Sequence, residues 1–295
     1  MNKQRFYGIL LAIAGILMFS SKAVMVKLAY QYEVDTVSLL LLRMVFALPF
    51  YLVISFFGKP KQEVKKGDIV WVFFLGFIGY YLASYFDFLG LQYVKAGLER
   101  LILFVYPTLV LLISYIFLKK KITREQAMGV AITYTGVIVI FASELQINQE
   151  SGVILGSLLI FLSALTYAGY LVGSGWIIPK FGPRLFTSYA MIVSCFAVIV
   201  HYVVLGDFDI LSLHPNVYWI GLAMAVFATV IPSYLISYAI KSLGANNFSL
   251  FGSLGPVSTI VLAYFFLGEI LTLTQVVGGL VIIFGIFIAE RKKQI

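Results

Sequence analysis

Long apolar stretches separated by short polar bridges recur along the whole chain. Ten of them are about 17 to 27 residues long, which is enough for a helix to cross the roughly 30 Å hydrocarbon core of a bilayer. The pattern therefore predicts an all-α integral membrane protein with ten transmembrane helices. The expected helices span residues 6–30, 36–57, 69–92, 96–118, 126–143, 152–178, 185–205, 216–240, 245–267 and 273–289.

The composition agrees with this interpretation. Hydrophobic residues make up 61% of the chain and charged residues only 12%, and the mean hydropathy is +1.00. A water-soluble domain needs a more polar surface. The net charge of +8 does not indicate nucleic-acid binding, because Lys and Arg stand in the short bridges between apolar runs. With Cys195 as the single cysteine, an intrachain disulfide is excluded.

The distribution of basic residues predicts the orientation in the membrane. If the N-terminus is cytoplasmic, sixteen Lys and Arg of the bridges and termini lie on the cytoplasmic side, and only Lys95 lies on the other. This asymmetry follows the positive-inside rule. The first apolar run continues past Lys22 without a cleavage-site pattern, which favours an uncleaved helix. We expect a multi-pass protein of the bacterial inner (plasma) membrane with both termini cytoplasmic.

The second half of the chain repeats the first. Pro107 and Pro256 are 149 residues apart, and the same offset pairs Gly136 with Gly285. Each unit then holds five helices, and since five is an odd number, the second unit enters the membrane from the opposite side. This predicts two inverted repeats, the architecture of many alternating-access transporters. The expected units are residues 1–148 and 149–295.

Two local patterns predict how helices begin and pack. A Thr-x-x-Gln sequence before the fifth and the tenth expected helix is typical of a capping box. Glycines spaced four apart on the sixth expected helix favour close helix contact. The caps are Thr123 with Gln126 and Thr272 with Gln275, and the glycine pairs are Gly152 with Gly156 and Gly169 with Gly173.

The repeat, the segment "SLGPVSTIVLAYFFLGEILT" and the glycine-spaced helix after it resemble the EamA family of the drug/metabolite transporter superfamily. The resemblance covers nearly the whole chain. It implies a bundle with a central substrate cavity lined by the first four helices of each repeat, helices five and ten at the periphery, and export of amino acids and related metabolites. In the first repeat Lys120 stands at the place of Glu269, so only one copy of that acidic motif is present. We interpret Glu269 mainly as a turn residue at the outer end of its helix.

Five charged residues fall inside the expected spans at similar depth. Counting about 1.5 Å per residue from the helix ends places them in one layer roughly 5–12 Å below the outer surface. Charges in a span are expensive and usually face a cavity, the bundle interior or one another. The layer consists of Lys22, Arg43, Asp87, Glu99 and Arg100.

Two interpretations of this layer remain open. The charges are either ion pairs that hold the first repeat together, with Lys27 reaching the headgroups, or the lining of a substrate cavity. In the second case the three cations and two acids leave one positive charge, which suits a carboxylate or phosphate group of a substrate. The second repeat has no matching charge, because the equivalent places of Asp87, Glu99 and Arg100 are taken by Ile236, Phe248 and Ser249.

Tyrosines accompany the charged layer. Tyr81 and Tyr85 follow helical spacing on the third expected helix, and Tyr106 lies seven residues after Glu99 on the same side of the fourth. We include these three tyrosines as candidate substrate contacts, while packing is the other explanation of an aromatic stripe. Weaker candidates are Tyr167, Tyr170 and Trp176, and Tyr80 and Ser84 share a helix face with Asp87.

These features predict a secondary transporter that exports amino acids or related small anionic or zwitterionic metabolites by alternating access. Multidrug or organic-cation efflux is the alternative, and a channel fits a two-repeat bundle less well. An intramembrane hydrolase is disfavoured, because Ser174 and His201 are expected about 20 Å apart along the membrane normal. No motif indicates an enzyme or a cofactor. The expected partners are a small-molecule substrate and the lipid bilayer; proton coupling and the oligomeric state stay open.

Overall fold

The computed structural model describes residues 3–145, 152–206, 210–252, 254–268 and 273–290, and all regular elements within these ranges are helices. The first half contains α1 (Lys3–Tyr30), α2 (Thr36–Phe56), α3 (Lys66–Gly76), η1 (Phe77–Leu82), α4 (Ala83–Gly90), α5 (Ala96–Leu103), α6 (Tyr106–Leu118) and α7 (Arg124–Leu145). The second half contains α8 (Val153–Phe181), α9 (Pro183–Leu205), α10 (Pro215–Ala225), η2 (Val226–Val230), α11 (Ile231–Leu243), α12 (Ala245–Phe251), α13 (Leu254–Leu267) and α14 (Leu273–Glu290).

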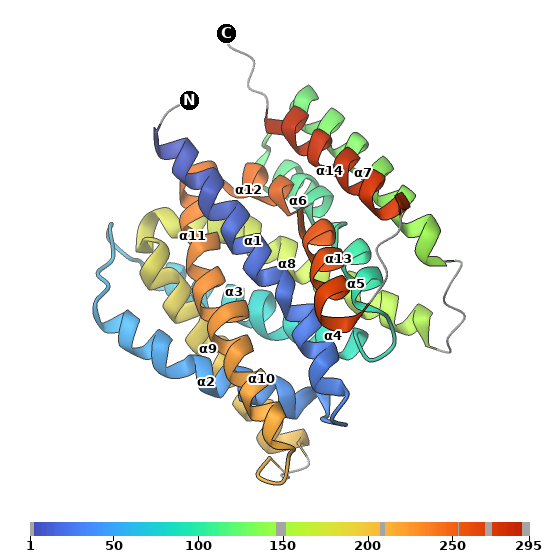
Figure 1. Cartoon of the computed structure of the whole chain (residues 1–295). Helices are drawn as coiled ribbons and strands as arrows, with labels where there is room; N and C mark the ends of the chain where they lie inside the picture. The colour runs from blue at the N-terminus through green and yellow to red at the C-terminus, as the bar shows by residue number, and fades with distance from the viewer. Residues whose placement is uncertain (1–2, 146–151, 207–209, 253, 269–272, 291–295) are drawn as a thin grey trace.

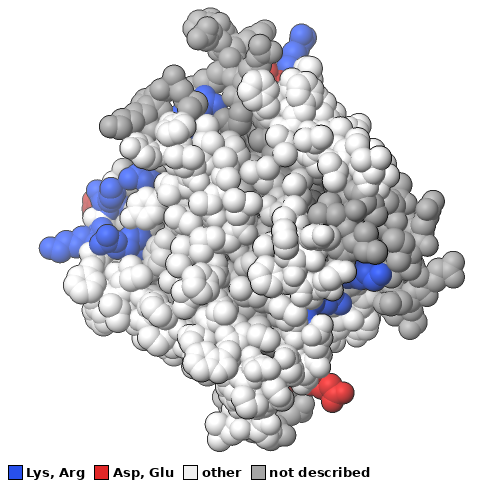
Figure 2. All heavy atoms as spheres, in the orientation of Figure 1, with Lys and Arg blue, Asp and Glu red and all other residues white. Residues whose placement is uncertain are grey.

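Six helical stretches are long and apolar enough to cross a membrane, and shorter apolar helices accompany them. Figure 2 shows one broad face of the molecule on which charged side chains are confined to the margins. Such an uncharged surface suits contact with lipid, so the prediction of an all-α membrane protein is confirmed. The six long stretches are Gln4–Tyr30, Thr36–Phe56, Lys66–Gly90, Val153–Phe181, Pro183–Leu205 and Pro215–Leu243.

Two long helices contain a π-helical segment at the same place in the two halves. η1 lies between α3 and α4, and η2 lies between α10 and α11. Phe77 and Val226, with which these segments begin, are 149 residues apart, the offset of the sequence repeat. A π segment changes the direction of the side chains that follow it, and π-bulges are frequent at functional sites. In η1 the backbone is also closely packed, since a Cβ at Gly79 would lie 2.3 Å from Tyr170 Cβ.

Two expected helices, 96–118 and 245–267, are each two helices rather than one. The first is interrupted between α5 and α6, and the second between α12 and α13. Proline explains the first interruption, because Pro107 in the first turn of α6 has no N–H to offer the preceding turn and its ring crowds the carbonyl of Leu103. Pro256 stands at the corresponding place of α13. The continuous apolar runs predict one helix in each case, because apolar length alone does not show where a proline ends a helix.

Helices α7 and α14 lie side by side at one edge of the bundle (Figure 1). Their glycines allow the backbones to touch: a Cβ at Gly136 would be 2.6 Å from Gly278 O, and a Cβ at Gly285 would be 2.9 Å from Gly129 O. Gly129 and Gly278 are equivalent positions of the sequence repeat, and so are Gly136 and Gly285. Each contact is therefore the other one with the two helices exchanged. A pair of helices related by a local two-fold axis meets in this way. This edge position is the one that the resemblance implied for helices five and ten.

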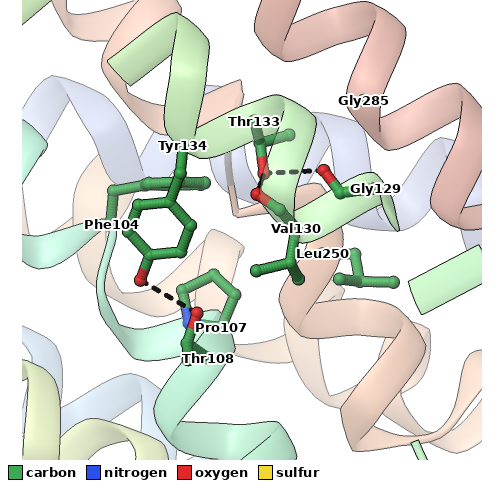
Figure 3. A pocket seen from close by; sticks show the side chains of 9 residues that line it. All are labelled: Phe104, Pro107, Thr108, Gly129, Val130, Thr133, Tyr134, Leu250 and Gly285. Atoms are coloured by element: carbon green, nitrogen blue, oxygen red, sulfur yellow. Dashed lines mark hydrogen bonds between the residues drawn. The ribbon is translucent and has the colours of Figure 1, made fainter. Parts of the chain in front are cut away.

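A cavity of about 10 Å³ lies where α7 meets α6 (Figure 3). Thr108 Oγ1 donates a 2.9 Å hydrogen bond to Tyr134 Oη at its edge, and Thr133 Oγ1 donates to the carbonyls of Gly129 and Val130. This volume is only about enough to hold one water molecule. This cavity is therefore too small to be a substrate site.

The structure confirms the predicted cap before α7. Thr123 N donates to Gln126 Oε1 at 3.1 Å, and Gln126 N donates to Thr123 Oγ1 at 3.2 Å. Two backbone N–H groups of the helix start are satisfied by this exchange. The corresponding cap, which includes Thr272, lies outside the described residues, as does Glu269.

The glycines of α8 have different environments. A Cβ at Gly156 would lie 2.7 Å from Tyr93 Cβ, and a Cβ at Gly173 would lie 2.4 Å from Leu75 Cδ2, so these two positions are closely packed as predicted. A Cβ at Gly169 would meet only Ile78 Cδ1, at 3.6 Å. This is an ordinary van der Waals distance, so α8 is packed less closely at Gly169 than at Gly156 and Gly173.

Candidate functional site

Four helices bring the five charged residues of the predicted layer together. Lys22 comes from α1, Arg43 from α2, Asp87 from α4, and Glu99 and Arg100 from α5. All five are buried, with at most 5% of the residue exposed. Charged residues are almost never fully buried unless they are paired, so the arrangement of their partners is informative.

Lys22 and Asp87 form a buried ion pair. Lys22 Nζ lies 2.6 Å from Asp87 Oδ2. The ammonium group also lies over the Phe19 ring, 4.8 Å from its centroid, and 6.0 Å from the centroid of Phe88. A desolvated cation over an aromatic face gains about 2 kcal/mol, which offsets part of the cost of burial. The pair joins α1 to α4.

Arg100 is held by two partners. Its Nε lies 3.1 Å from Glu99 Oε2, and its Nη2 donates to Phe19 O at 3.3 Å. This links α5 to α1 beside the Lys22–Asp87 pair. The contact between Arg100 and Glu99 is an ion pair without a hydrogen bond, because Arg100 Nε and both Glu99 oxygens have no hydrogen-bond partner among the described residues.

The carboxyl groups of Asp87 and Glu99 are near enough to interact electrostatically. In the part of the chain that the structure describes, none of their four carboxyl oxygens has a hydrogen-bond partner. Two carboxylates cannot donate to each other, whereas a carboxyl pair that holds one proton can. Such a pair shares a proton because two adjacent like charges are unfavourable in a buried site.

Arg43 differs from Lys22 and Arg100 in having no ion-pair partner among the described residues. Its guanidinium lies over the Phe88 ring, 4.8 Å from the centroid, and the residue is 2% exposed. Among the described residues, its Nε and Nη2 have no hydrogen-bond partner. Asp87 is near enough to interact electrostatically, but it is paired with Lys22. Two donors of a buried guanidinium are thus left for another acceptor, which a bound anion can supply.

Aromatic rings continue the site from the charged residues into the second half. Tyr167 lies between Phe19, at 6.1 Å, and Tyr106, at 5.4 Å between ring centroids. Tyr170 follows at 5.9 Å from Tyr167, and its Oη donates to Tyr80 Oη at 3.0 Å. The sequence predicts Tyr106 as a substrate contact, and Tyr167 and Tyr170 as weaker candidates for the same role. The signal for Tyr80 was its position seven residues before Asp87, on the same helix face.

The structure places Tyr81 and Tyr85 in a different cluster. Tyr81 Oη forms a 3.0 Å hydrogen bond with His201 Nδ1, and the Tyr85 ring lies 4.7 Å from the His201 ring. Both tyrosines are partly exposed, and their described contacts are with α9 and their own helix rather than with the charged residues. Tyr81 lies within the π segment η1 and Tyr85 follows it, and this segment alters the regular helical spacing from which the two tyrosines are predicted.

The disfavoured hydrolase pair has other partners. Ser174 Oγ donates to Leu171 O in its own helix, whereas His201 contacts Tyr81 and Tyr85. A nucleophile and its base need to approach within about 3 Å. These two side chains are engaged elsewhere.

The second half of the bundle is polar through hydroxyl groups. Thr187 Oγ1 donates to Ser237 Oγ at 2.5 Å, and Ser188 Oγ shares a 2.8 Å hydrogen bond with Tyr234 Oη. Hydroxyls can both donate and accept, so these pairs are complete without charge. The equivalents of the first-half charges, Ile236, Phe248 and Ser249, are all buried.

Comparison with known proteins gives one consistent result. The EamA-like transporter family model matches the chain twice, over residues 6–142 and 154–290. An uncharacterized transporter of Bacillus subtilis (strain 168), YcbK, is 29% identical over 293 residues, which are 97% of this chain and 93% of the relative. An uncharacterized transporter of Archaeoglobus fulgidus is 29% identical over 254 residues, which are 85% of this chain and 87% of the relative.

The fold is also found among solved structures. A protein crystal structure superposes with a TM-score of 0.75 at 15% identity and covers 96% of both chains. This likeness concerns the fold. The two family matches together span most of the sequence and include every helix that contributes to the charged site. The chain belongs to the EamA-like transporter family.

Proposed function

We propose that this membrane transporter is a secondary carrier with ten membrane spans in two inverted five-span units, residues 1–148 and 149–295. The matched positions of η1 and η2 support this arrangement, as do the two family matches and the exchanged glycine contacts between α7 and α14. On the positive-inside rule both termini are cytoplasmic, in the inner membrane of a bacterium. The two units rock about a central site to give alternating access.

The substrate is a small anionic or zwitterionic metabolite such as an amino acid, and the observation that carries this proposal is Arg43. A fully buried guanidinium with two donors left over binds a carboxylate or phosphate strongly, because the interaction is charge-assisted and takes place away from water. Lys22 and Arg100 are neutralised by Asp87 and Glu99, so the surplus positive charge belongs to Arg43.

The tyrosines beside the charges form the apolar part of the site. Tyr106, Tyr167 and Tyr170 present ring faces from both halves of the chain. Rings that contact the substrate from both units are well placed to respond to the relative movement of the units. Tyr81 and Tyr85 then belong to a second contact region next to His201.

A proton is the proposed coupling ion, held between Asp87 and Glu99. The groups that face this pair are Lys22 from α1, Arg100 from α5 and Arg43 from α2. Protonation removes one negative charge beside Arg43, so the site becomes more attractive to an anion. By thermodynamic reciprocity, anion binding then strengthens proton binding by the same factor.

Transport by the purified protein in proteoliposomes tests this function. Amino acids, organic acids and quaternary amines are compared with and without an imposed pH gradient. We expect carboxylate-bearing substrates to be transported, with a rate that depends on the pH gradient and loses this dependence in Glu99→Gln. Export in cells follows from the family resemblance, and accumulation of the substrate inside a deletion strain checks it.

Organic-cation efflux is the second candidate, because the adjacent acids Asp87 and Glu99 are also a possible cation site if their basic partners move away. Selective transport of quaternary amines by the wild-type protein, with no transport of carboxylates, would overturn the anionic proposal in favour of this one.

A further inference from the structure

Two apolar grooves lie on the sides of the bundle. The first, here called the α3–α8 groove, is bounded by α3, η1, α6 and α8 and has a volume of about 410 Å³. This volume lies in the range of about 300–1,000 Å³ that is usual for sites of small ligands. Its lining includes Trp71, Phe74, Ile78, Ile113, Phe117 and Trp176.

The second, called the α1–α13 groove, is bounded by α1, η2 and α13 and has a volume of about 440 Å³. It is the counterpart of the first groove in the sequence repeat. The repeat offset of 149 residues pairs Ile78 with Phe227 and Phe117 with Phe266. The starts of the two family matches, residues 6 and 154, pair Ser21 with Gly169. The two grooves therefore have the same architecture, and their differences are differences of sequence.

One end of the α3–α8 groove is surrounded by lysines. Trp71 near the start of α3, Phe117 near the end of α6 and Trp176 near the end of α8 mark this end. Lysine stands at the corresponding end of all three helices, and Lys180 Nζ lies 4.8 Å from the centroid of Trp176. These lysines are Lys66 at the start of α3, Lys119, Lys120 and Lys121 after α6, and Lys180 in α8, of which all but Lys180 are exposed.

The corresponding end of the α1–α13 groove has a different charge. The chain that follows α1 contains the acids Glu33 and Asp35, and in the described residues no run of lysines follows α13. The α1–α13 groove thus provides a control within the same molecule: its shape and apolar lining are similar, but this end has one lysine, Lys27 in the last turn of α1, together with the two acids.

We propose that the α3–α8 groove binds an anionic diacyl phospholipid, with an acyl chain in the groove and the headgroup phosphate at the lysines. The groove runs from Trp71 to Ile78, which is about 10 Å along the helix, and so reaches from the headgroup region toward the middle of the roughly 30 Å core. Tryptophans are suited to the level where acyl chains meet headgroups. Gly169, which has no side chain, lines the groove that the acyl chain would fill.

The charge explains why the lipid should be anionic. A lipid tail of any kind fills an apolar groove, but a lysine near the membrane surface adds about 1 kcal/mol of attraction for an anionic lipid, roughly a fivefold preference. Lys180 is partly neutralised by Asp68, 2.5 Å away, whereas Lys119, Lys120 and Lys121 are exposed after the end of α6. This proposal concerns the lipid-facing side of the protein and does not depend on the transported substrate.

Tryptophan quenching by brominated lipids tests the proposal. Two of the three tryptophans line the groove, and Trp219, 70% exposed on α10, is the third. The full-length Trp219→Phe variant is reconstituted in phosphatidylcholine with increasing fractions of brominated phosphatidylglycerol or brominated phosphatidylcholine. We expect phosphatidylglycerol to associate at least about fivefold more strongly near Trp71 and Trp176, as expected for one lysine or more.

Paired variants locate the site. Gly169→Leu places a side chain in the groove that Gly169 lines, and Ser21→Leu makes the equivalent change in the α1–α13 groove. Joint replacement of Lys66, Lys119, Lys120 and Lys121 by Gln removes the exposed charges at the groove, and Lys95→Gln is its control. We expect Gly169→Leu and the multiple lysine variant to reduce the phosphatidylglycerol preference to below twofold. Ser21→Leu and Lys95→Gln should leave this preference unchanged.

Equal quenching by the two brominated lipids in Trp219→Phe would overturn the proposal, as would a preference that survives removal of the four exposed lysine charges. The lysine variant alters only exposed side chains, so it keeps the test decisive even if Gly169→Leu does not fold.

Discussion

The two halves of this transporter have different residues at equivalent buried positions: charged in the first half and uncharged in the second. Asp87, Glu99 and Arg100 in the first half are replaced by Ile236, Phe248 and Ser249 at the equivalent places of the second, and all six are at most 5% exposed. The fold therefore accepts an apolar or neutral residue at each of these places. Packing alone does not require the charges of the first half.

The polar groups of the two halves also differ in energetic terms. A hydroxyl pair such as Thr187–Ser237 satisfies itself as a neutral hydrogen bond worth about 1 kcal/mol. A buried ion pair must first be removed from water, and its attraction often only offsets this cost. The first half thus carries a structural cost that the second avoids, which favours a role for its charges in binding.

The largest effect is expected where a buried pair is broken. Asp87→Asn leaves Lys22 charged and without its partner in a buried site, so it should lower the free energy of unfolding by about 3–5 kcal/mol. Asp68→Asn is the control, because its pair with Lys180 is partly exposed and is worth at most about 1 kcal/mol. Thermal unfolding of the two variants in the same detergent measures the difference, and equal losses would show that Asp87 does not act through a buried pair.

A charge introduced in the second half should be harmful, too. Ile236→Asp places the acid at the counterpart of Asp87 but without a lysine beside it, at an expected cost of about 3 kcal/mol. Ile236→Val removes only a methylene and should cost about 1 kcal/mol. The amount of folded protein in the membrane reports both changes. If Ile236→Asp accumulates like Ile236→Val, the two halves are more alike in their tolerance of charge than we infer.

The smallest effect concerns the hydroxyl pairs. Ser237→Ala leaves the Thr187 hydroxyl without its acceptor and should cost about 1 kcal/mol, whereas joint replacement by Thr187→Val and Ser237→Ala should be nearly neutral. The same thermal assay compares the single and the double variant. A double variant that is markedly less stable than the single one would mean that this pair has partners or a role beyond its own hydrogen bond.

Much of this architecture follows from sequence pattern, and the exceptions have physical causes. Apolar runs locate helices because hydrocarbon leaves the backbone no other partner than itself. The distance of each charged residue from its helix end predicts a common depth in the membrane for Lys22, Arg43, Asp87, Glu99 and Arg100. In the structure these residues contact one another or the same aromatic rings.

Sequence pattern failed where local geometry departs from a regular helix. The π segment η1 changes which side chains share a face of the third expected helix, so regular helical spacing predicts Tyr81 and Tyr85 as substrate contacts. In the structure, Tyr80 of that segment is the tyrosine that forms a hydrogen bond with Tyr170. Which acid pairs with which cation was not predictable, because depth fixes only one coordinate of each side chain. The role of these residues in substrate binding stays a prediction.

The central claim is that Arg43 holds the anionic group of the substrate, and its replacement by lysine tests this most directly. Lysine keeps the charge but lacks the planar fork that binds a carboxylate through two parallel hydrogen bonds. Arg184→Lys, at the exposed start of α9, is the matched control. For a transported carboxylate, Arg43→Lys should weaken apparent affinity at least about tenfold, or about 1.4 kcal/mol, with normal amounts of protein in the membrane. Arg184→Lys should leave the affinity unchanged. Unchanged carboxylate affinity in both Arg43→Lys and Arg43→Gln would contradict the account.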